Sequence, residues 1–186
     1  MADPIRDTGL LVLDVWRIRE ALAAHPELWN RHQGRTAPED SPHHQVDDIF
    51  IRFAAPGVDT TRDYDSVWYD PAATMLGVKD AVYDLAQKLR ADRIGGILIT
   101  RIPPGKSVQP HVDRGWHAEY YRKYGIQIAS AQGQAFCFDG VRFESEPGDV
   151  YEFRNDVPHW VVNDSSEERI TMIVCLRLEQ SVEWRI

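Results

Sequence analysis

The sequence predicts a mainly β protein, a sandwich or jelly roll, whose helices are confined to the N-terminal part. The main observation is a series of short apolar, β-branched runs after Gly95-Gly96. They occupy residues 96–102, 108–111, 126–130, 135–138, 148–153, 159–163 and 169–177. Turn signals such as Gln132-Gly133 and Asp139-Gly140 separate them. Short strands at this rhythm are typical of two-sheet β folds.

Before this series, the sequence predicts helices and irregular chain. Residues 10–13 form a short apolar run, and Asp14 is a candidate cap for a helix that ends at Pro26. Residues 80–90 return to helical spacing, and residues 30–48 form a polar loop of a length that is often functional. We therefore expect one domain over residues 1–186, with a helical and irregular part at 1–94 and a jelly-roll core at 95–178.

An early strand is expected at residues 48–53, where polarity alternates. The alternation puts Phe50 and Arg52 on the face opposite Ile49, Ile51 and Phe53. Arg52 is therefore expected to point toward solvent or into a polar cavity. A surface arginine paired with a neighbouring aspartate is the alternative.

Composition narrows the possible functions. The chain has 186 residues, with 43% hydrophobic and 27% charged residues, as in ordinary globular proteins. Its net charge of -8 disfavours nucleic acid as a partner, including for an oxygenase that acts on bases. Cys137 and Cys175 lie in apolar runs and are expected to be buried. Without a signal peptide or a long apolar run, the expectation is a soluble, cytoplasmic protein with no membrane partner.

The strongest functional signal is a set of metal-ligand residue types. His111 and Asp113 are two residues apart, so on an extended chain they leave the same face. His159 opens another strand, and two histidines with one carboxylate are the ligand set of non-haem Fe(II) oxygenases. This set leaves positions open for a co-substrate and dioxygen. The pair in His117-Ala-Glu119 is a rival candidate.

Arg169 is the first residue of the last strand, and its guanidinium can donate two parallel hydrogen bonds to a carboxylate. It shares one strand face with Thr171, Ile173 and Cys175. If Arg169 points into a barrel, Thr171 and Ile173 line the cavity behind the metal.

With these residues identified, residues 45–177 resemble the aspartyl/asparaginyl β-hydroxylase family of Fe(II)/2-oxoglutarate dioxygenases. The resemblance rests on Ile-Pro-Pro-Gly before His111-x-Asp113, the Gly-Asp turn at 148–149, Asn155 ahead of Pro158-His159-Trp160, and Arg169-Ile170. It implies a double-stranded β-helix, a jelly roll of cupin-like form. It also implies that His111, Asp113 and His159 are the iron ligands and catalytic residues, and that Arg169 binds the far carboxylate of 2-oxoglutarate.

The activity implied by the resemblance requires Fe(II), 2-oxoglutarate and dioxygen. It is hydroxylation of an unactivated C–H bond in an amino acid or a peptidyl Asp/Asn-type substrate, with 2-oxoglutarate converted to succinate and CO2. Family members often carry Arg-x-His where this chain has Lys123-Tyr124-Gly125. The second carboxylate contact of the co-substrate therefore falls to Lys123 or Arg122. Asp113 is kept, as in the bacterial free amino-acid hydroxylases and unlike the animal peptidyl enzymes.

Three further residues are expected near the substrate. In related hydroxylases an arginine on the early strand holds a substrate carboxylate, so Arg52 predicts a small-molecule or peptide substrate that carries one. Trp116 and His117 follow the ligands closely and are candidates for substrate contact, with aromatic surface packing as the alternative. The competing function is a cupin-like metal protein, either a zinc or manganese isomerase or a non-catalytic binding module. Zinc accepts the same ligands but has no need for Arg169.

Overall fold

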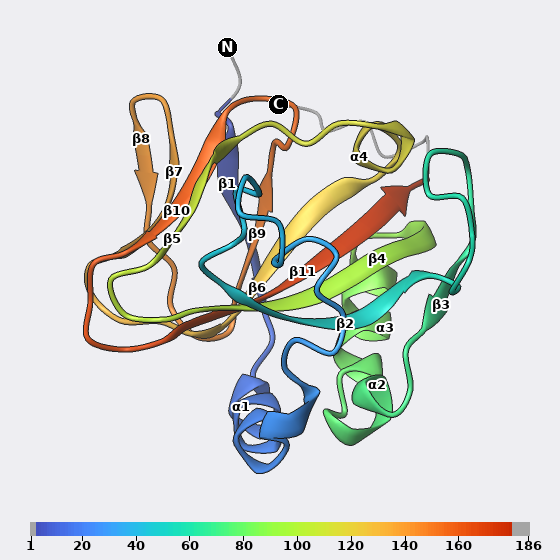
Figure 1. The fold of residues 1–186 in the computed structure, drawn as a ribbon, viewed down its shortest axis with the longest axis horizontal. Coiled ribbons are helices and arrows are strands. Elements are labelled where there is room, and N and C mark those ends of the chain that lie inside the picture. Colours follow the sequence, from blue (N-terminus) through green and yellow to red (C-terminus); the bar gives the residue numbers. More distant parts are fainter. Residues whose placement is uncertain (1–2, 180–186) are drawn as a thin grey trace.

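The computed structural model describes residues 3–179, which fold into two antiparallel sheets (Figure 1). The larger, seven-stranded sheet has the order β1 (Ile5–Leu11), β9 (Asp149–Phe153), β6 (Arg122–Ala129), β11 (Arg169–Leu178), β4 (Ala91–Ile102), β2 (Asp47–Ala54) and β3 (Ser66–Trp68). The four-stranded sheet has the order β5 (Ser107–His111), β10 (His159–Asn163), β7 (Gln134–Phe138) and β8 (Val141–Phe143). Neighbouring strands are mostly distant in sequence, and the arrangement confirms the expected mainly β jelly roll.

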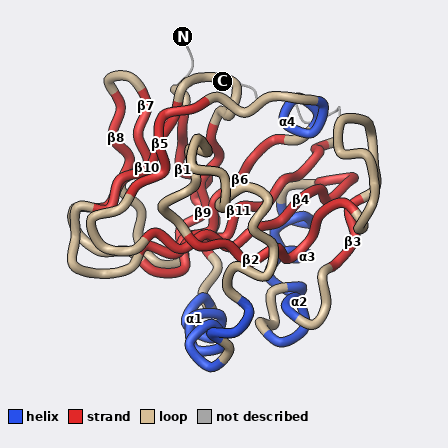
Figure 2. Tube along the Cα trace, viewed as in Figure 1, coloured by secondary structure: helices blue, strands red, loops and turns tan. Residues whose placement is uncertain are grey.

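The helices α1 (Val15–Ala24), α2 (Ala72–Met75) and α3 (Lys79–Lys88) lie together on one side of the larger sheet, as Figure 2 shows. α1 and α3 confirm the two helices expected from spacing. A 3-10 turn, η1 (Pro26–Leu28), follows α1, and α4 (Trp116–Tyr120) lies apart from the other helices. Within residues 3–179, no helix combines the length and apolar character needed to cross a bilayer.

Side-chain alternation gives the two central strands, β4 and β11, two different faces. One face packs under the helices and is fully buried, with Ile97, Ile99, Met172 and Val174 at 0% exposure. The other face looks toward the smaller sheet and lines a cavity; it carries Leu98, Thr100, Thr171 and Ile173. The alternation expected for the last strand is therefore confirmed.

In β2 the alternation expected from the sequence is interrupted. Phe50 pairs with Leu98, but Arg52 pairs with Ile97, so two steps along β2 match one step along β4. This β-bulge changes which face each following side chain occupies. Phe53 joins Phe50 in lining the cavity, and Arg52 turns to the face that carries Ile97. The prediction that Phe50 and Arg52 share a face is wrong for this reason.

Candidate metal centre and cofactor cavity

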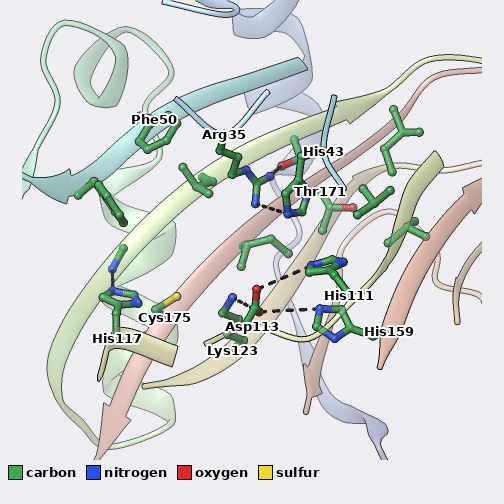
Figure 3. Close-up of a pocket in the computed structure, with 18 of the residues that line it drawn as sticks. Arg35, His43, Phe50, His111, Asp113, His117, Lys123, His159, Thr171 and Cys175 are labelled. Atoms are coloured by element: carbon green, nitrogen blue, oxygen red, sulfur yellow. Dashed lines mark hydrogen bonds and ion pairs between the residues drawn. The ribbon is translucent and has the colours of Figure 1, made fainter. Parts of the chain in front are cut away.

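The predicted ligands His111, Asp113 and His159 meet between the two sheets (Figure 3). His111 ends β5 and His159 begins β10, and the two residues are direct partners in the antiparallel pairing. Asp113 follows β5, where its backbone N–H donates to the carbonyl of Asn155 at 2.9 Å. One ligand atom from each side chain lies within 4.8 Å of the others. Over residues 3–179 this is the sole cluster of three or more potential ligands.

Backbone carbonyls orient both imidazoles toward the carboxylate. Nδ1 of His111 lies 2.8 Å from the carbonyl of Gln109, and Nδ1 of His159 lies 2.9 Å from that of Val157. An Nδ1–H that donates to a carbonyl leaves Nε2 unprotonated and able to bind a metal. The two Nε2 atoms lie 3.7 and 3.8 Å from Asp113 oxygens. These donors fit a divalent transition metal.

The protonation states suit metal binding as well. Burial lowers the pKa of His111 and of His159, so both rings stay neutral near pH 7. Burial alone raises the pKa of Asp113, but the ion pair with Lys123 and the adjacent imidazoles outweigh burial and lower it. Lys123, from β6, donates directly to Asp113 Oδ2. The carboxylate is therefore ionised and held by one of its oxygens.

The cluster opens into a cavity of about 700 Å³. Arg169, the first residue of β11, lines this cavity and is only 3% exposed. Its guanidinium donates to the hydroxyl of Thr171 and, at 3.3 Å, to that of Tyr151. No carboxylate in residues 3–179 pairs with it. A buried cation without an acidic partner is costly, and an anionic ligand in the cavity offsets that cost.

The polar loop that the sequence marked at residues 30–48 reaches the cavity, although the sequence did not identify which of its residues do so. Arg35 donates to both oxygens of Asp48, at 2.7 and 3.0 Å, and to Thr100 Oγ1 at 3.1 Å. Asp48 is fully buried, so this pair fastens the loop to β2 and β4. His43 packs edge-on against His111, with ring centroids 4.7 Å apart. The available signals were the length of the loop and its polar, histidine-rich composition.

The remaining predicted site residues divide into two groups. Lys123 and His117 line the cavity, and His117 Nε2 accepts a hydrogen bond from the backbone N–H of Gly96 at 3.1 Å. Arg122 and Trp116 do not line it: Arg122 points to the opposite side of β6 and pairs with Glu152, and the Trp116 indole donates to the carbonyl of Thr60. The predictions for these two residues are corrected accordingly.

Arg52 and the rival metal pair are also placed away from the centre. Arg52 lies beside a separate pocket, with its guanidinium over the Trp68 ring at 5.1 Å from the centroid and its Nε bonded to the Ile94 carbonyl. The expectation that it reaches the metal cavity is therefore corrected. His117 and Glu119 fall in α4, where residues two apart point in different directions, and Glu119 is exposed.

Comparison with known proteins agrees with this geometry. Residues 78–177, more than half of the chain, match the family model of the aspartyl/asparaginyl β-hydroxylases. A 2OG-Fe(II) oxygenase family oxidoreductase from Burkholderia pseudomallei has a similar fold, with TM-score 0.54 and 19% identity over 84% of this chain and 77% of that one. No curated protein matches the sequence.

Two prolyl hydroxylases also share the fold. A prolyl-4-hydroxylase from Pseudomonas putida has TM-score 0.51 and 16% identity over 95% of this chain and 93% of that one. A viral collagen prolyl hydroxylase from Paramecium bursaria Chlorella virus-1 has TM-score 0.53 and 11% identity over 96% and 98%. At these identities the likeness concerns the fold, whereas the family model identifies the chain itself. The chain belongs to the aspartyl/asparaginyl β-hydroxylase family of Fe(II)- and 2-oxoglutarate-dependent dioxygenases.

Proposed function

We propose that the protein is a hydroxylase in which His111, Asp113 and His159 hold Fe(II) and Arg169 holds the far carboxylate of 2-oxoglutarate. The observation that carries the proposal is that one cavity contains both an oriented two-histidine, one-carboxylate cluster and a buried arginine that pairs with no carboxylate among residues 3–179. A metal cluster alone fits many proteins. The arginine also favours a ligand that places an anionic group against the guanidinium while another part of the ligand binds the metal.

The bound iron and 2-oxoglutarate supply the oxidising chemistry, in which dioxygen is consumed, 2-oxoglutarate becomes succinate and CO2, and a C–H bond of the substrate is hydroxylated. The chain's own residues orient and shield these groups. The Gln109 and Val157 carbonyls fix the imidazole tautomers. Tyr151 and Thr171 hold the Arg169 guanidinium in place, and Gln127 accepts from Thr171 at 3.1 Å.

Lys123 is assigned two roles at the metal. By donating to Oδ2 of Asp113, it would leave Oδ1 as the oxygen that binds the metal. An ammonium group has three donors, so those not used by Asp113 would be able to hold a carboxylate of 2-oxoglutarate. This is the second carboxylate contact expected from the sequence, and Arg122, which faces away, does not provide it.

The substrate is proposed to be a small molecule or a peptide side chain. The expected substrate carboxylate depended on Arg52, which lies outside the cavity. Arg35 does line the cavity, but buried Asp48 already balances its charge. Arg169 disfavours the isomerase and binding-module alternatives. Neither role requires a buried guanidinium that binds a carboxylate in the metal cavity.

Succinate formation from 2-oxoglutarate tests the proposal. The purified protein supplied with Fe(II) should form succinate slowly without substrate, whereas the zinc-loaded protein should form none. Arg169→Ala should need far more 2-oxoglutarate, and Arg154→Ala, which removes an exposed arginine paired with Asp156, is the matched control. Absence of iron-dependent succinate in a protein that binds iron would contradict the proposal and favour the non-oxygenase alternative.

A further inference from the structure

The cavity extends from the metal cluster to a row of aromatic rings, which we call the aromatic wall. The wall consists of His32, Phe50, Phe53, Tyr69 and His117. Adjacent ring centroids lie 5.0 Å apart for His32 and Tyr69, 5.4 Å for Phe50 and Phe53, and 6.0 Å for Phe53 and His117. Phe50 and Phe53 are half-buried although they point inward. Aromatic area therefore remains uncovered inside the cavity.

An apolar floor joins the aromatic wall to the co-substrate end of the cavity. Phe50 is the cross-strand partner of Leu98, and Leu98 is the partner of Ile173 on β11. Thr171 and Arg169 follow on the same face of β11. Leu98 and Ile173 are half-buried even though their strands lie in the middle of the sheet. This uncovered stripe leads from the aromatic rings toward the proposed 2-oxoglutarate site.

The rings of the aromatic wall are held in position by contacts outside the cavity. The Tyr69 hydroxyl donates to the Ala54 carbonyl at 2.5 Å, and Tyr64 stacks on His117 with an interplanar angle of 16°. Gly96 leaves room for the end of the wall, because an added Cβ would lie 3.2 Å from Phe53 and 3.3 Å from His117. The wall is thus ordered before a ligand arrives, which favours recognition of a defined shape.

This part of the cavity has no uncompensated charge among the described residues. Asp48 balances Arg35, and Asp113 balances Lys123. Burial, the largest influence, lowers the pKa of His117 to about 4, so its ring is neutral at pH 7. An uncharged group of a ligand should therefore bind more favourably here than a charged one. Aromatic side chains pack well against other rings in offset or edge-on arrangements.

On the basis of the proposed function, we propose that the substrate presents an uncharged, planar aromatic ring to this wall. The ring contacts Phe50 and Phe53, and Leu98 supports the path from the ring to the metal. A free aromatic compound and an aromatic side chain within a peptide share this chemistry.

Binding can be measured without turnover, using anaerobic protein loaded with Fe(II) and 2-oxoglutarate. The probes are phenylalanine, N-acetylphenylalanine amide, cyclohexylalanine, proline and aspartate, followed by ligand-observed NMR titration. At least one of the two phenylalanine probes should bind about fivefold or more tightly than cyclohexylalanine, because only a planar π system gains ring-to-ring contact. Preference for the amide indicates a peptide source, and preference for the free amino acid indicates a small molecule.

Phe50→Leu and Phe53→Leu should each weaken binding of the aromatic probe about fivefold. Trp16→Leu, which changes an exposed ring on α1 outside the cavity, should alter neither probe binding nor substrate-free succinate formation. The inference is overturned if neither phenylalanine probe binds, if cyclohexylalanine binds equally well, or if the two cavity variants bind like the parent. Failure of the proposed function has a different signature, namely no succinate from any protein while the ring preference persists.

Discussion

His111 and His159 face each other across the pairing of β5 and β10, with their ring centroids 4.3 Å apart and tilted by 52°. Strand register, rather than closeness in sequence, brings the two rings together. Replacing either histidine should therefore remove one metal ligand while the pairing of β5 and β10 persists.

His111→Ala and His159→Ala should each abolish iron-dependent activity and weaken Fe(II) binding by more than the roughly 10- to 100-fold loss typical of removing a supporting contact. Calorimetric titration with Fe(II) under nitrogen measures the affinity. His25→Ala, which removes a half-buried histidine next to Glu27 and far in sequence from the ligands, is the control. Near-normal affinity and turnover in both ligand variants would place the metal elsewhere.

Arg169→Ala should raise the 2-oxoglutarate requirement sharply while iron binding is retained. The expected loss is about 2 to 4 kcal/mol, since a charge-assisted contact to the carboxylate disappears in a dry cavity. Arg169→Lys should recover little, because an ammonium cannot present two parallel donors. The apparent affinity for 2-oxoglutarate, taken from succinate formation, is the readout. Unchanged affinity in both variants would remove Arg169 from the co-substrate site.

Arg35→Met should destabilise the protein by about 3 kcal/mol, because it leaves the fully buried Asp48 carboxylate without its charged partner. Arg52→Met is the matched arginine variant outside the metal cavity and should leave substrate-free succinate formation intact. Urea unfolding measures the stability of each variant. Adding Asp48→Asn to Arg35→Met should recover part of the loss, and strictly additive effects would show that the pair is not coupled.

Stability should depend on pH through His117, whose pKa burial lowers from 6.5 to about 4. Between these values the unfolded chain binds a proton at this position and the folded chain does not, so the free energy of unfolding falls as pH decreases. His117→Gln cannot titrate and should lose less stability over the same window. Urea unfolding between pH 7.5 and 4 compares the two, and parallel curves would contradict the assignment.

The sequence was informative where alternation along a strand continues without interruption. On β11 it correctly grouped Arg169, Thr171 and Ile173 on one face, and all three line the cavity. On β2 a single bulge made the predicted faces wrong, so that Phe53 rather than Arg52 lines the cavity. A bulge depends on pairing with a neighbouring strand, so the periodicity of one segment does not reveal it.

The set of metal-ligand residues was predictable because these residue types have few other uses in that order and spacing. The position of Arg35 in the cavity was not predictable, because irregular chain has no periodicity from which the direction of a side chain can be inferred. Its position depends on Asp48, a carboxylate that is buried only because β2 and β4 enclose it. Contacts of this kind require the tertiary structure and cannot be found from local pattern.

Because one face of β4 and β11 packs under the helices and the other lines the cavity, sequence changes on the two faces should have different effects during evolution. Residues that anchor the helices, such as Ile99 and Met172, alternate with residues that look into the cavity, such as Leu98 and Ile173. A substitution at an inward position can reshape the space open to a ligand while the neighbouring outward positions keep the helices attached. Substitutions at these cavity-facing positions can therefore change which substrates bind while the fold is retained.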